Sequence, residues 1–157
     1  MASSDLCHKI ETDVEIKASA QQFHDMFWKR PHHISTACDD KIHACELHEG
    51  DWGTVGAIVV WHYTHDGERK VAKVLVEAVD EENNSITFRV LEGDLMKEYK
   101  SFVAHIQATP KSDGNGCKVH WIIEYERLHD GIDHPETLLE FAVEVSKDMD
   151  AHLISNN

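Results

Sequence analysis

One glycine-rich loop has the composition that phosphate-binding loops share, with Gly50, Gly53 and Gly56 at short spacings. A phosphate loop needs a helix directly after it, because the aligned N–H groups of the first helical turn hold the anion. Here the next segment, 57–63, has the composition of a β-strand, and Glu49 and Asp51 would repel a phosphate. We therefore interpret the glycine loop as a sharp connection between two strands.

Thirteen histidines make a metal site the second chemistry to consider. Structural zinc sites combine two pairs of ligands at short spacings. His43 and Cys45 share a strand face, and His32 and His33 are adjacent, but neither group has a second half in the sequence. We expect solvated histidines, no bound metal and no cofactor.

The composition of the chain limits its partners and its surroundings. With 157 residues it is the size of one domain, 1–157, and its formal net charge of −14 argues against nucleic acid as a partner. The first residues contain no apolar core of the kind a signal peptide has, no apolar run is long enough to insert into a membrane, and the four cysteines form no close pair. We expect a cytoplasmic protein that is a monomer or a weak dimer.

Hydrophobic periodicity predicts the elements that position these residues. Alternation of apolar and polar side chains indicates seven β-strands, at 10–16, 42–48, 57–63, 71–79, 86–91, 96–109 and 118–126. Helical spacing predicts two short helices and one long one, at 20–28, 32–37 and 135–154. This order of elements predicts an α+β fold with one antiparallel sheet and one long helix.

The dimensions of these elements raise the possibility of an internal cavity. Seven strands spaced about 4.8 Å apart make a sheet nearly 30 Å wide, whereas one helix is about 10–12 Å across. The sheet must therefore curve around the long helix, and the short helices must close one end. From the pattern alone, a hollow interior and a fully packed core are equally consistent with the sequence.

Three separated segments resemble the plant major latex protein-like family: 49–56, 93–102 and 134–139. That family belongs to the Bet v I superfamily, named after the major birch pollen allergen, which has the START-like, helix-grip fold. The resemblance extends over nearly the whole chain. It implies a seven-stranded curved antiparallel sheet wrapped around the C-terminal helix, with a cavity for hydrophobic small molecules.

The resemblance also implies which side chains form the wall of that cavity. Carried over by position, they are Phe23, Phe27, Val59, Trp61, Tyr63, Val71, Ile86, Phe88, Val90, Phe102, Ala104, Ile106, Val119, Trp121, Ile123, Phe141 and Val145.

The function that the resemblance implies is to sequester or carry a hydrophobic molecule, such as a sterol, a steroid, a hormone-like compound or a specialised metabolite, in plant defence or stress. An isomerase or cyclase is the alternative, with Lys73, Lys100 and Tyr63 as candidates for acid–base catalysis. For both lysines we favour a position in solvent or at the rim of the cavity over one inside it. A protein-interaction role in defence signalling remains open as well.

Overall fold

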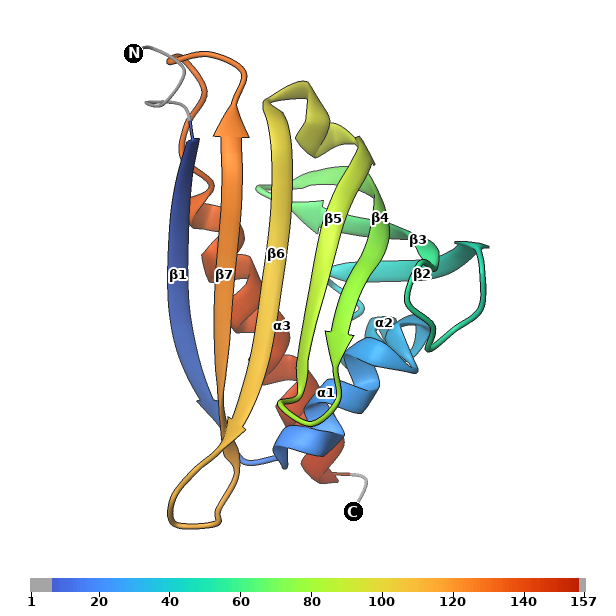
Figure 1. The fold of residues 1–157 in the computed structure, drawn as a ribbon, viewed down its shortest axis with the longest axis vertical. Coiled ribbons are helices and arrows are strands. Elements are labelled where there is room, and N and C mark those ends of the chain that lie inside the picture. Colours follow the sequence, from blue (N-terminus) through green and yellow to red (C-terminus); the bar gives the residue numbers. More distant parts are fainter. Residues whose placement is uncertain (1–6, 156–157) are drawn as a thin grey trace.

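The computed structural model describes residues 7–155, in which a seven-stranded antiparallel sheet curves around a long C-terminal helix (Figure 1). The strands are β1 (Cys7–Ile16), β2 (Ile42–Glu49), β3 (Ile58–His65), β4 (Glu68–Asp80), β5 (Ser85–Gly93), β6 (Tyr99–Pro110) and β7 (Cys117–Arg127). Their order across the sheet is β1-β7-β6-β5-β4-β3-β2. The predicted fold class is confirmed, and residues 1–6 and 156–157 of the expected domain lie outside the described residues.

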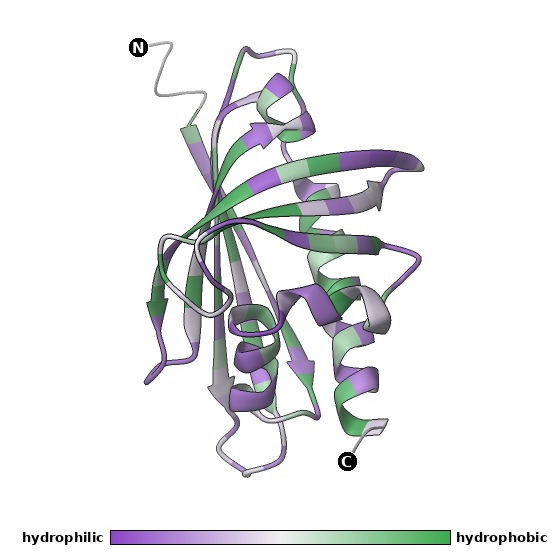
Figure 2. Ribbon diagram, turned by 90° about the vertical axis from the view of Figure 1, so that its right-hand side faces the viewer, coloured by the Kyte–Doolittle hydropathy of each residue, from purple (hydrophilic) through white to green (hydrophobic). Residues whose placement is uncertain are grey.

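The alternation of side chains determines which face of the sheet is buried, as the hydropathy colouring of Figure 2 shows along the strands. In β7, every second residue from Cys117 to Tyr125 is buried. The concave face carries these apolar side chains and turns towards the helices. The convex face is polar and rich in ion pairs between neighbouring strands.

Three helices cover the concave face of the sheet. The long helix α3 (Glu136–Ser155) crosses behind it, the short helix α1 (Ala20–Trp28) closes its lower end in Figure 1, and the short helix α2 (Ile34–Ala37) lies below β2. A capping box starts α1: Ser19 Oγ accepts from the Gln22 backbone N–H, and the Gln22 side chain accepts from the Ser19 N–H. A 3-10 turn, η2 (Pro31–His33), links α1 to α2.

The glycine loop joins β2 to β3, and its three glycines, Gly50, Gly53 and Gly56, have φ values of 82°, 73° and 92°. Side chains other than glycine rarely adopt such values, so the loop depends on these residues for its sharp path. The indole of Trp52 stacks on the ring of His32 with 4.2 Å between ring centroids, which ties the loop to η2.

One predicted strand begins later than its sequence suggests. The segment 96–109 was expected to be extended throughout, but residues Asp94–Lys97 form the 3-10 turn η3 and β6 starts at Tyr99. The break follows Gly93, whose φ is 120°. A Cβ there would lie 2.1 Å from the Val71 carbonyl oxygen, so the chain turns at a position that only glycine can occupy without a backbone shift.

Candidate functional site

An apolar cavity of about 170 Å³ lies between the concave face of the sheet and α3. Strands β2 to β7 contribute its wall together with η3 and all three helices. The small side chains of Ala72, Ala104 and Ala142 lie among much larger neighbours in this wall. The helix and the bulky side chains therefore do not fill the whole space inside the curved sheet, and free volume remains.

Twelve of the residues expected in the wall line this cavity. They are Phe27, Trp61, Tyr63, Phe88, Val90, Phe102, Ala104, Ile106, Trp121, Ile123, Phe141 and Val145. Each strand residue in this set lies on the concave side of its strand, and Phe141 and Val145 lie four residues apart on one face of α3.

Five of the expected wall residues lie elsewhere. Phe23, Val59, Ile86 and Val119 are at most 2% exposed, but neighbouring side chains in the solid part of the core cover them. Val71 is 39% exposed, because it lies on the outer face of β4 while Ala72, one position on, faces inward. Its assignment to the wall was wrong by one residue of strand register.

Seven further residues line the cavity and were not in the expected set: Ile34, Ile42, Ala72, Val74, Leu95, Leu138 and Ala142. Leu138 and Ala142 belong to the apolar stripe that the periodicity of the C-terminal helix already indicates. Ala72 and Val74 follow once the inward side of β4 is known. Ile34 begins the four-residue helix α2 and Leu95 lies in the 3-10 turn η3, and both elements are too short for a periodic signal to identify the buried side.

Three of the residues that line the cavity, Trp61, Tyr63 and Trp121, carry a polar side-chain atom, and those of Trp121 and Tyr63 differ in their hydrogen bonding. The indole N–H of Trp121 donates to Ser146 Oγ at 2.9 Å. The hydroxyl of Tyr63 is buried and has no hydrogen-bond partner among the described residues. Burial raises the pKa of Tyr63, and the nearby carboxylates of Asp94 and Glu98 raise it further, so the phenol stays protonated at neutral pH.

The two lysines considered for catalysis do not reach the cavity. Lys73 Nζ lies 3.1 Å from Glu92 Oε2 on the outer face of the sheet. Lys100 has a 71% exposed side chain whose Nζ lies 3.8 Å from Glu126 Oε2. Since both ammonium groups are on the outer face, neither can transfer a proton to a molecule inside, and only Tyr63 of the three candidates lines the cavity.

The histidines of the convex face are paired with side chains of neighbouring strands. His62 Nε2 lies 2.6 Å from Glu46 Oε1, and His105 Nε2 lies 3.0 Å from Glu124 Oε2. Within residues 7–155, no group of three or more His, Cys, Asp or Glu side chains is arranged to hold a metal ion.

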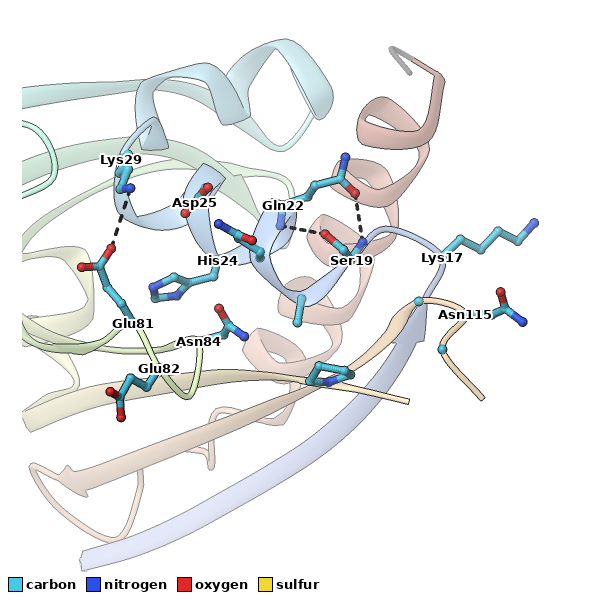
Figure 3. Close-up of a pocket in the computed structure, with 15 residues that line it drawn as sticks. Lys17, Ser19, Gln22, His24, Asp25, Lys29, Glu81, Glu82, Asn84 and Asn115 are labelled. Carbon is cyan, nitrogen blue, oxygen red and sulfur yellow. Dashed lines mark hydrogen bonds and ion pairs between the residues drawn. The ribbon is translucent and has the colours of Figure 1, made fainter. Parts of the chain in front are cut away.

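A larger cleft of about 970 Å³ lies on the surface, between α1 and the β4–β5 and β6–β7 hairpins (Figure 3). Two pairs of its polar groups interact: Ser19 and Gln22 form the capping box, and Lys29 Nζ lies 3.7 Å from Glu81 Oε1. Both signs of charge are present on its wall. The cleft therefore separates α1 from two hairpins, and its mixed charges do not favour one kind of ligand.

A curved sheet that encloses an apolar cavity against one long helix defines the helix-grip class of α+β domains. A model of the pathogenesis-related protein Bet v 1 family matches residues 6–156, and the chain belongs to this family, whose members bind hydrophobic ligands. Among the residues described, no helix has both the length and the apolar composition needed to cross a membrane.

The relatives of the chain are major latex protein-like proteins of plants. It is 64% identical over 153 residues to MLP-like protein 31 of Arabidopsis thaliana, covering 98% of this chain and 90% of that protein. It is also 64% identical over 146 residues to MLP-like protein 34 of the same plant, covering 93% of this chain but only 46% of that protein, or about half its length. The crystal structure of major latex-like protein 151 from Panax ginseng superposes with a TM-score of 0.90 at 38% identity, covering 94% of this chain and 97% of that one.

Proposed function

We propose that this protein binds a small hydrophobic molecule in the cavity between α3 and the sheet, and sequesters or carries it in the cytoplasm of a plant cell as part of a defence or stress response. One observation carries the proposal: a cavity of about 170 Å³ is walled almost entirely by apolar side chains. A buried water molecule needs two to four polar partners, which this wall does not provide, so the cavity favours an apolar occupant.

The volume limits the size of the occupant. An apolar cavity of about 150 Å³ accepts a molecule of the size of benzene. The present cavity therefore suits one ring with a short substituent, and a sterol-sized ligand would require the lid helices α1 and α2 to move outwards. Each Å² of apolar ligand surface removed from water contributes about 25 cal/mol before the costs of association.

Binding can be tested by titrating the protein with ethylbenzene and following backbone amide shifts by NMR. We expect shifts at the cavity wall, and we expect Trp61→Arg to abolish them because a guanidinium in this wall would bring an unpaired charge into an apolar space. Val71→Arg is the matched control, since it places the same side chain on the outer face of the neighbouring strand.

If the arginine at position 61 unfolds the protein, Ala142→Met provides an uncharged alternative that fills the cavity from α3. We expect it to weaken ethylbenzene binding at least tenfold while circular dichroism stays unchanged. Wild-type protein that shows no shifts, or undiminished binding in folded Trp61→Arg and Ala142→Met variants, would refute the proposal.

A further inference from the structure

The hydroxyl of Tyr63 is the polar feature that distinguishes the wall of this cavity. Of the described residues that line it, Tyr63 alone has a buried side-chain polar atom without a hydrogen-bond partner. The indole N–H of Trp121, another polar group of the wall, is already bonded to Ser146 Oγ. Buried hydroxyls in folded proteins nearly always have a partner, so this one needs an explanation.

A trapped water molecule is a poor partner for this hydroxyl. Buried water is stable where it makes about three hydrogen bonds, and besides the Tyr63 hydroxyl the described wall residues offer only the indole N–H groups of Trp61 and Trp121 as side-chain polar partners. The ring of Tyr63 packs 5.9 Å from that of Phe141, centroid to centroid, which keeps the phenol within the wall. The missing partner is therefore best supplied by the molecule that fills the cavity.

We propose that the ligand is a neutral, mostly hydrocarbon molecule with one oxygen that accepts a hydrogen bond from the Tyr63 hydroxyl, such as a ketone, an aldehyde or an alcohol. This inference rests on the function proposed above and narrows it to one ligand chemistry. It assigns Tyr63 the role of selecting among hydrophobic molecules of similar shape.

The charges around the cavity exclude an anionic version of the same ligand. No described residue of the wall has a charged side chain, so a carboxylate would lose its hydration without gaining a cation. Asp94 and Glu98 interact unfavourably with negative charge at the Tyr63 oxygen, and the nearest lysine of the β3–β4 hairpin, Lys70, instead has its Nζ 3.4 Å from His65 Nδ1. A carbonyl or hydroxyl oxygen fits this position, whereas a carboxylate oxygen does not.

Three compounds of nearly the same shape separate these possibilities: acetophenone, its hydrocarbon analogue α-methylstyrene, and benzoate. Dissociation constants would be measured by NMR titration for the wild type, for Tyr63→Phe and for a control, Tyr99→Phe. Tyr99 is a suitable control because its hydroxyl donates to the Asp133 carbonyl at 2.8 Å and the residue does not line the cavity.

We expect Tyr63→Phe to weaken acetophenone binding about fivefold, as the loss of one neutral hydrogen bond implies, and to leave α-methylstyrene binding unchanged or slightly tighter. Tyr99→Phe should change neither, and benzoate should bind at least tenfold more weakly than acetophenone. Equal effects of Tyr63→Phe on acetophenone and α-methylstyrene, or benzoate binding as tightly as acetophenone, would overturn the inference but not the proposed function. Failure of the wild type to bind either neutral compound would remove the proposed function itself.

Discussion

A single serine on α3 determines how one large wall residue of the cavity is held. Ser146 Oγ accepts the indole N–H of Trp121 at 2.9 Å and donates to the Ala142 carbonyl at 2.8 Å, and Ser146 is fully buried. The hydroxyl thus satisfies a donor on β7 and an acceptor one turn back in its own helix. It links the helix to the sheet at the cavity.

We expect Ser146→Ala to lower the free energy of unfolding by about 1–3 kcal/mol, because the indole N–H would remain buried without a partner. Urea denaturation measures the change. Ser155→Ala, at the exposed end of the same helix, should change stability by less than about 0.5 kcal/mol. An equally small effect at position 146 would show that the indole finds another partner.

For a single residue, the sequence predicts to which face of the sheet its side chain points, but not which side chains it contacts. Alternation in 118–126 places Trp121 inwards, and the structure agrees. Its bond to Ser146 depends on how α3 is rotated against the sheet, which no local pattern encodes. That the Tyr63 hydroxyl has no hydrogen-bond partner among the described residues likewise follows only from the positions of all neighbouring elements.

At the scale of elements, the C-terminal part of α3 holds the connection between β1 and α1. The carboxylate of Asp150 accepts hydrogen bonds from the backbone N–H groups of Lys17, at 3.0 and 3.1 Å, and of Ala18, at 2.7 Å. These residues lie 132 to 133 positions away in the sequence. The contact fixes the direction in which the chain enters the lid helix.

We expect Asp150→Asn to lower the free energy of unfolding by about 1 kcal/mol, since the bonds are charge-assisted but partly exposed to water. Glu144→Gln removes one negative charge from an exposed position of the same helix and serves as the control. Both variants would be compared by thermal and urea unfolding. An equal change in the two would assign the effect to net charge rather than to the hydrogen bonds of Asp150.

The elements themselves were largely predictable, and their ends less so. Helix α1 begins and ends where its capping box and apolar spacing place it. In β4 the sequence around Val71 is apolar on both faces, and a bulge near Val74 shifts the register, so alternation could not decide the inward side. The sixth strand was predicted to start at residue 96 and starts at Tyr99 instead. The chain turns after Gly93, whose backbone lies against Val71 of the neighbouring strand β4, and this contact is not encoded in the local sequence.

At the scale of the whole molecule, two buried histidines and one half-buried histidine make stability depend on pH. Burial is the main reason that the pKa values of His24, His32 and His65 are lowered. The unfolded chain therefore binds protons more readily than the folded protein once the pH falls below about 6.5. The free energy of unfolding should therefore be highest above that pH and decrease as the solution becomes more acidic.

His24 is the best position for a test, because it is 3% exposed and its Nε2 has no hydrogen-bond partner within the described residues. Asp25 and Glu81 favour its protonated form, but less than burial disfavours it. We expect the loss of unfolding free energy between pH 7.5 and 5.5 to shrink in His24→Gln. The exposed His48→Gln variant should keep the wild-type slope, and an unchanged slope in both would contradict the prediction.

The sequence alone determined the fold class and the family, because strand alternation, helical spacing and three separated motifs are local patterns that can be recognised in the sequence itself. It also predicted that one helix is too narrow to fill a seven-stranded sheet. Only the tertiary structure decided the cavity's volume, its exact wall and the isolation of the Tyr63 hydroxyl. These depend on side-chain packing between elements that are distant in the chain, where the rotation of α3 and the register of β4 set which atoms meet.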